Sequence, residues 1–61
     1  MERIVLNPKI LGGKPVIRGT RMSVQFILEL LSSGMDIQEI LDEHPHLTHR
    51  DIQAAIRYGG I

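Results

Sequence analysis

Apolar residues recur at helical spacing from residue 24 onward. In the first such segment they stand at positions i, i+3, i+4 and i+7: Val24, Ile27, Leu28 and Leu31. Ser23 precedes them as a favoured amino-terminal cap, and Gly34 follows where a left-handed carboxy-terminal cap would end the helix. Phe26 and Leu30 widen the apolar stripe, so this helix is expected to be buried on most of its sides.

A start motif that occurs twice predicts two more helices. Asp36 with Glu39, and Thr48 with Asp51, each match a capping box. Apolar residues flank both boxes at hydrophobic-staple positions: Met35 with Ile40, and Leu47 with Ile52. Pro45 ends the second helix, and two glycines after residue 58 end the third. The expected inward-facing residues are Ile37, Ile40 and Leu41, then Ile52, Ala55 and Ile56 with Ala54 and Tyr58 beside them.

The first 22 residues lack this helical pattern. Two β-branched apolar runs, Ile4–Leu6 and Val16–Arg18, stop at turn residues and predict short strands. Strands this short must pack on the helices or pair with another chain. The sequence therefore indicates one mainly-α domain over residues 1–61, with a β arm and loop over 1–22 and three helices over 23–58. The last two helices have the layout of a helix-turn-helix module.

The small size of the chain favours self-association. Sixty-one residues form only a marginal core, which disulfides, a metal or oligomerisation usually compensate. The absence of cysteine removes the first remedy and excludes thiolate zinc sites. A homodimer is therefore expected, with Arg3–Leu6 as the segment that pairs or exchanges between chains. Because no apolar run reaches the roughly 18 residues that span a membrane, and Met1–Leu6 does not resemble a signal peptide, a cytoplasmic protein is expected.

The formal net charge is zero, but the charges are unevenly distributed. Residues 1–21 hold five basic residues against Glu2, whereas residues 22–47 hold five acidic residues and no lysine or arginine. Such asymmetry can mark a binding surface, although two solvated faces would produce it equally well. The acidic part offers candidate contacts to a basic protein partner, with capping as the alternative role of the first two: Asp36, Glu39, Asp42 and Glu43.

Basic and amide side chains gather on one face of the third predicted helix. Arg50, Gln53 and Arg57 lie at i, i+3 and i+7, opposite Ile52 and Ile56. Arginine and glutamine can bond guanine and adenine edges in the major groove, so this face is a candidate DNA-reading surface. An ordinary solvated face is the alternative. The acidic second helix weakens the DNA hypothesis, because it would lie near phosphates in the usual docking mode.

Other patterns in the sequence argue against catalysis. His44, His46 and His49 are closely spaced, but a proline and a helix start separate their rings, which favours turn polarity over a metal site. The Gly12–Lys14 segment lacks the outer glycine and the hydroxyl of a phosphate-binding loop. No serine, histidine and acid are placed for nucleophilic chemistry, so neither an enzyme nor a cofactor is expected.

The segment that contains the second predicted strand and leads to the first helix reads Gly-Lys-Pro-Val-Ile-Arg-Gly-Thr-Arg, from residue 13 to residue 21. Gly19 can adopt a positive φ there, and Thr20 can bond the local backbone. Arg18 and Arg21 form a basic pair that either supports the fold or contacts a partner. Together with the residues of the third helix, those of this segment give six candidate DNA-binding residues: Arg18, Thr20, Arg21, Arg50, Gln53 and Arg57.

This run resembles the signature of a bacterial family, the domain of unknown function numbered 433. The resemblance extends over nearly the whole chain through further segments: Ile27–Leu31, Gly34, Ile40–Leu41, Pro45–Thr48 and Asp51–Tyr58. It implies a homeodomain-like or winged helix-turn-helix fold. It also implies an antitoxin that neutralises a PIN-like ribonuclease toxin, encoded by a neighbouring gene, and represses its own operon.

Members of that family usually continue past the tyrosine of the third helix, and such a tail is a natural toxin-binding arm. Since the sequence ends at Ile61, toxin contact is expected either to use the folded domain or to be missing. Two rival functions stay open beside the antitoxin. One is a stand-alone DNA-binding regulator, and the other is a dimeric interaction module without DNA contact.

Overall fold

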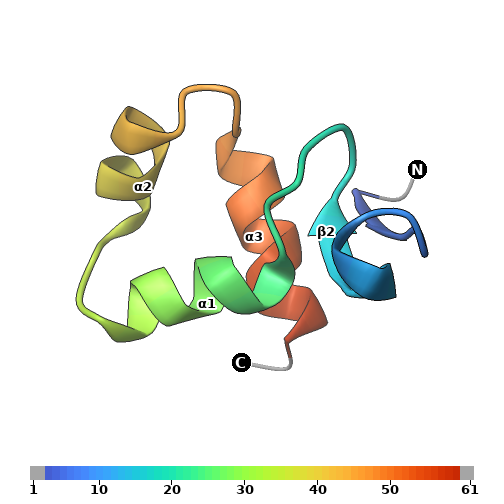
Figure 1. Cartoon of the computed structure of the whole chain (residues 1–61). Coiled ribbons are helices and arrows are strands. Elements are labelled where there is room, and N and C mark those ends of the chain that lie inside the picture. The colour runs from blue at the N-terminus through green and yellow to red at the C-terminus, as the bar shows by residue number, and fades with distance from the viewer. Residues whose placement is uncertain (1–2, 60–61) are drawn as a thin grey trace.

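The computed structural model describes residues 3–59, which form a short hairpin followed by helices. In chain order the elements are β1 (Ile4–Leu6), the 3-10 turn η1 (Leu11–Gly13), β2 (Pro15–Ile17), α1 (Val24–Ser32), α2 (Ile37–Glu43) and α3 (His49–Tyr58). Figure 1 shows α2 at one side of the molecule and the hairpin at the other, with α3 between them. This arrangement confirms the mainly-α prediction, while the second strand begins and ends one residue earlier than expected.

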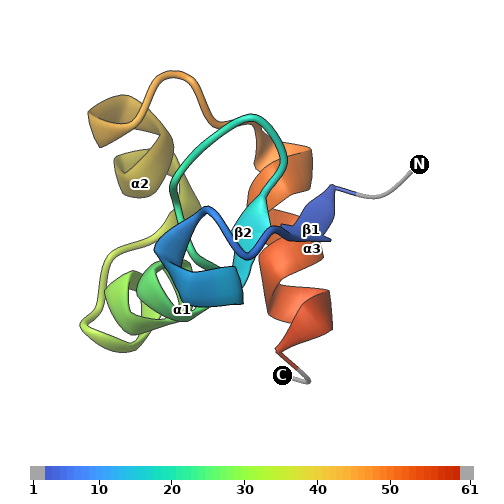
Figure 2. The same ribbon diagram turned by 45° about the vertical axis from the view of Figure 1, so that its right-hand side comes forward.

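The two strands pair with each other inside the chain, in antiparallel register. Ile4 lies opposite Ile17, and Val5 lies opposite Val16. Because Val16 and Ile17 are fully buried, β2 anchors the hairpin on the helices, and β1 lies along α3 (Figure 2). The two strands thus pair with each other and pack on the helices. The sequence had left open whether they would pack on the helices or pair with another chain.

The helix starts are capped as the sequence predicts. The hydroxyl of Ser23 accepts the Phe26 N–H at 3.0 Å. Complete capping boxes begin α2, through Asp36 and Glu39, and α3, through Thr48 and Asp51. These side chains accept hydrogen bonds from backbone N–H groups that have no partner within their helix.

The end of α1 is also confirmed. Gly34 has φ of +104°, and its N–H donates to the Leu31 carbonyl at 3.1 Å. The Met35 N–H donates to the Leu30 carbonyl at 3.2 Å, which completes a Schellman motif and turns the chain towards α2.

The core lies where the three helices and β2 meet. Its largest side chains, four isoleucines and a valine, are at most 1% exposed: Ile17, Ile27, Ile40, Ile52 and Val16. Each α-helix therefore contributes one central isoleucine, and the hairpin adds a fourth. None of the helices in residues 3–59 combines the length and apolar character needed to cross a membrane.

Two aromatic positions differ from expectation. Phe26 was expected to be buried but is 41% exposed, because α1 packs on α3 and β2 along the Val24–Ile27 side. Its ring instead packs against that of His44 in a T-shaped contact, with 6.4 Å between the ring centroids. Tyr58, expected beside the inward face of α3, is 53% exposed. Both residues lie on the edge of an apolar stripe, where the spacing of residues along a helix does not determine burial.

Candidate nucleic-acid interface

The solvent face of α3 carries the predicted cluster of basic and amide side chains. Arg50, Gln53 and Arg57 are all exposed, while Ile52 and Ala55 on the opposite side are fully buried. The capping box at Thr48 begins the helix immediately before these residues, so their spacing of three and four residues places them along one side. The prediction that they share an outward face is confirmed.

Next to this face lies an open groove of about 500 Å³ between α3 and the start of β1. Its lining combines three arginines, an amide, a phenol and two apolar side chains: Arg3, Ile4, Arg50, Gln53, Ala54, Arg57 and Tyr58. The groove thus unites the predicted helix face with two residues from β1 and its flank. Guanidinium groups beside a phenol ring suit an anionic, partly planar ligand such as a nucleic-acid strand.

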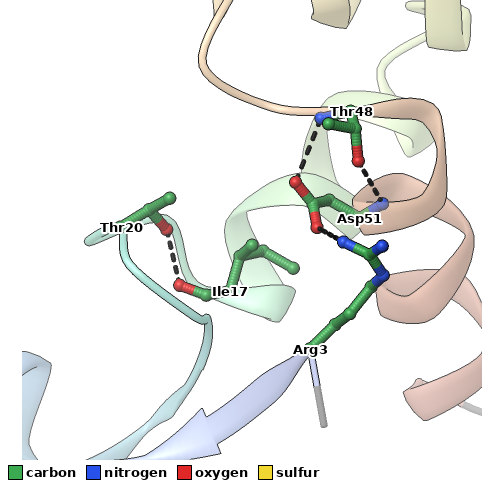
Figure 3. Close-up of polar contacts among 5 residues, drawn as sticks. All are labelled: Arg3, Ile17, Thr20, Thr48 and Asp51. Atoms are coloured by element: carbon green, nitrogen blue, oxygen red, sulfur yellow. Dashed lines mark hydrogen bonds and ion pairs between the residues drawn. The ribbon is translucent and has the colours of Figure 1, made fainter. Parts of the chain in front are cut away.

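Arg3 is tied to α3 by an ion pair. Its Nη1 lies 2.9 Å from Oδ1 of Asp51, as Figure 3 shows. The other oxygen of Asp51 accepts the Thr48 N–H at 3.0 Å, and the Thr48 hydroxyl accepts the Asp51 N–H at 3.2 Å. Asp51 therefore caps the helix and positions Arg3 at the same time.

In the Gly-Thr-Arg turn before α1, Thr20 bonds the local backbone. The Thr20 hydroxyl donates to the Ile17 carbonyl at 2.8 Å (Figure 3) and accepts the Met22 N–H at 3.0 Å. Together with Gly19 at φ of +79°, these bonds close the turn that leads from β2 into α1. Thr20 thus holds the local backbone, as one of its two sequence-based interpretations proposed.

The two arginines of this turn are exposed, but neither lines the groove. The Arg18 N–H donates to the Arg3 carbonyl at 2.7 Å, which places the Arg18 backbone beside the start of β1. Arg21 follows three residues later, after the turn. The six candidate DNA-binding residues therefore divide into a helix group inside the groove and a turn group outside it.

The acidic candidates gather on α2 and are all exposed. Asp36 and Glu39 bond each other's backbone N–H groups at 2.8 and 3.0 Å, so capping accounts for both. Asp42 accepts the Gln38 amide at 2.9 Å. Glu43 ends the helix. The first pair consequently has a structural role, and the second pair is the better candidate for a partner contact.

The histidines near the second turn do not assemble into a metal-binding group. His44 and His46 meet edge to face with 6.2 Å between ring centroids. Within residues 3–59, no three histidine, aspartate or glutamate side chains are grouped as metal ligands.

Four residues that line the groove were not among the predicted site residues: Arg3, Ile4, Ala54 and Tyr58. Arg3 lies just before a strand, and its partner is 48 positions away, so no local spacing links it to α3. Tyr58 follows Arg57 directly and continues the helix past the predicted face. The helical repeat could have signalled Tyr58, because residues 50, 54 and 58 follow one another at a spacing of four along one side of the helix.

Comparison with known proteins agrees with the fold and gives the family. The family described as protein of unknown function (DUF433) matches residues 4–59, and the chain belongs to this family. A crystal structure of a family member from Anabaena variabilis superimposes with a TM-score of 0.88 at 34% identity, over 92% of this chain and 55% of that one. An uncharacterized protein, y4eO, of Sinorhizobium fredii is 35% identical over 93% of this chain. The chain spans about a quarter (26%) of the length of that relative.

Proposed function

We propose that the chain is the DNA-binding domain of an antitoxin-type regulator, with α2 and α3 as its helix-turn-helix module. The observation that carries this proposal is the exposed row of Arg50, Gln53 and Arg57 on α3, a helix begun by a firm capping box. Side chains of these types read base edges when a helix enters the major groove. The neighbouring Arg3 adds a cation to the same surface.

Binding rather than catalysis suits the chemistry of this surface. The groove presents cationic, amide, phenol and apolar side chains, which attract and orient an anion. Asp51 lies behind them. One of its carboxylate oxygens accepts a hydrogen bond from Arg3 and the other accepts one from the Thr48 N–H, so the carboxylate has a structural role. We therefore infer a non-enzymatic role.

The test of DNA binding is fluorescence anisotropy with a labelled duplex from the region upstream of the gene, at about 50 mM salt and micromolar protein. The wild-type chain should bind, and the double variant Arg50→Ala/Arg57→Ala should lose most of its affinity. A matched double variant, Lys9→Ala/Lys14→Ala, removes the same charge from the exposed loop around η1 and should bind far better than the first. Absence of wild-type binding to this duplex would remove the proposal.

The antitoxin role rests on the family resemblance and on the exposed acidic side of α2. We propose that the partner is a PIN-like ribonuclease from the neighbouring gene, and that the same chain represses its own operon. Co-expression decides between this role and a stand-alone regulator. Rescue of cells from the neighbouring gene product supports the antitoxin, whereas DNA binding without rescue supports the regulator.

A dimeric interaction module is the second candidate. Leu6 is 63% exposed at the end of β1, and within the described residues β1 has a strand neighbour only in β2. An open strand edge with an exposed leucine invites a second copy. Sedimentation equilibrium should show a homodimer at about 100 μM, and a monomer at that concentration would contradict self-association.

A further inference from the structure

The ion pair between Arg3 and Asp51 presents a guanidinium group at the edge of the groove. The Arg3 side chain is 41% exposed, whereas that of Asp51 is 10% exposed, so an approaching anion meets the cation first. Both Asp51 oxygens are already bonded, one to Arg3 and one to the Thr48 N–H. Arginine carries five N–H donors, and within residues 3–59 the bond to Asp51 uses only Nη1 of Arg3, so Nε and Nη2 can donate to a ligand.

Arg3 lies beside α3 on the side that faces β1. Figures 1 and 2 both show α2 and the start of β1 on different sides of α3. The groove takes its lining from α3 and from Arg3 and Ile4, with no residue of α2. The exposed surface of α2 is acidic, with Asp42 and Glu43 in its last turn. The two flanks of α3 therefore carry opposite charge.

Resting on the proposed function, we propose that Arg3 is a phosphate-binding residue that holds one backbone strand of the DNA on the β1 side of α3. In this geometry α3 lies in the major groove, and the guanidinium of Arg3 donates to a phosphate at the groove edge. Asp51 is the positioning residue, because it fixes Arg3 against the amino-terminal turn of α3.

This docking differs from the usual helix-turn-helix mode, in which the first helix of the pair crosses the backbone. Here that helix is α2, and its carboxylates would repel phosphates at short range. The β1 side offers Arg3 in place of an acid, and the backbone of Arg18 lies next to it through the 2.7 Å bond to the Arg3 carbonyl. The charges thus direct the duplex towards the hairpin.

The test is the salt dependence of affinity for two labelled duplexes, the upstream region and a random sequence, between about 50 and 200 mM salt. Arg3→Gln should make the slope of log affinity against log salt less steep by ~0.9, as expected for one lost phosphate contact. Over that range the wild-type chain should lose roughly 3-fold more affinity than the variant. Both duplexes should weaken alike, because phosphates carry no sequence information. Lys9→Gln removes a charge from an exposed loop residue outside the groove and should leave the slope unchanged.

A second measurement does not depend on the fold of a variant. The Arg3 Nε–H signal of the wild-type chain, followed by NMR, should shift when the random duplex is added. An unchanged signal, or an Arg3→Gln slope equal to that of the wild type, overturns the phosphate contact while leaving DNA binding itself intact. Failure of the wild-type chain to bind either duplex instead removes the proposed function and this contact together.

Discussion

At the scale of single residues, several positions determine the local backbone conformation. Gly34 supplies the positive φ that ends α1, and Thr20 bonds both ends of the turn before α1. Gly59 differs from Gly34, since its φ is −73°. A Cβ atom there would lie 2.5 Å from Cδ1 of Leu28, so this glycine provides space for packing instead of an unusual conformation.

Gly34→Val should destabilise the fold through backbone strain alone. At φ of +104° a β-branched residue is strained, while no atom lies within 4 Å of the added Cβ. The cost should be about 1–3 kcal/mol. For a chain of this size each kcal/mol lowers the melting midpoint by roughly 4–8 °C, measurable by circular dichroism. Gly34→Asn is the control and should cost less, because asparagine tolerates left-handed conformations better. Equal midpoints for the valine variant and the wild type would contradict the role of Gly34.

Residue-level features were predictable where their cause is local. The positive φ at Gly34 follows from its place after an apolar stripe, and the bonds of Thr20 follow from its short hydroxyl side chain. The contact between Arg3 and Asp51 was not predictable, because 48 residues separate them and the packing of β1 on α3 brings them together. Phe26 was misjudged because its exposure depends on which elements cover α1.

At the scale of elements, α2 and α3 begin with the same capping box but differ in its surroundings. Glu39 is exposed, and its carboxylate accepts the Asp36 N–H at the start of its own helix, at 3.0 Å. Asp51 is buried and also holds Arg3. The two boxes therefore offer a comparison of one local motif in two environments.

Asp51→Ala should destabilise the chain more than Glu39→Ala. Both variants remove an acidic residue from the first turn and a bond to the cap N–H. Asp51→Ala also removes the ion pair with Arg3 at a buried position, so its cost should be about 2 kcal/mol against at most about 1 kcal/mol for Glu39→Ala. Urea unfolding measures both free energies. If the two variants lose equal stability, the burial of Asp51 and its bond to Arg3 contribute nothing.

The outer face of α3 should determine base preference through Gln53. If α3 reads bases, Gln53→Ala should reduce discrimination by about 1–3 kcal/mol at one base pair, seen in anisotropy with a set of single-site duplex variants. Arg18→Ala should weaken all duplexes alike, since Arg18 lies outside the groove and its expected contact is to phosphate. Gln25→Ala, on the exposed side of α1, is the control and should change neither quantity. An unchanged base preference for Gln53→Ala would exclude this residue as a base reader.

Elements were predicted well because their signals repeat along the chain. The cap residues Ser23, Asp36 and Thr48 made the starts of α1, α2 and α3 predictable from local sequence. The strands carried weaker signals. The predicted second strand began one residue too late, because Pro15 pairs with Leu6 and so belongs to β2. The groove could not be predicted, since it requires the relative placement of β1 and α3.

At the scale of the whole molecule, the net charge is zero, but two surfaces carry charges of opposite sign. The groove between β1 and α3 presents three arginines, and α2 presents four exposed carboxylates. A basic ligand and an acidic ligand would therefore meet different sides of the chain. The proposed DNA contact and the proposed contact to a basic protein would therefore use different sides of the domain.

The double variant Asp42→Lys/Glu43→Lys should slow association with the proposed ribonuclease partner and flatten the salt dependence of the association rate. Complementary charge speeds the encounter of two proteins, and reversal of two charges removes that attraction. The free energy of unfolding should stay within about 0.5 kcal/mol of wild type, because both residues are exposed and, within residues 3–59, the one side-chain bond lost is the 2.9 Å bond from Gln38 to Asp42. Stopped-flow measurements across a salt series give the association rate. Asn7→Lys adds a cation in the loop after β1, away from α2, and should change the rate less. If the double variant associates at the wild-type rate at every salt concentration, the acidic side of α2 is only solvated, and the proposed partner contact on α2 is contradicted.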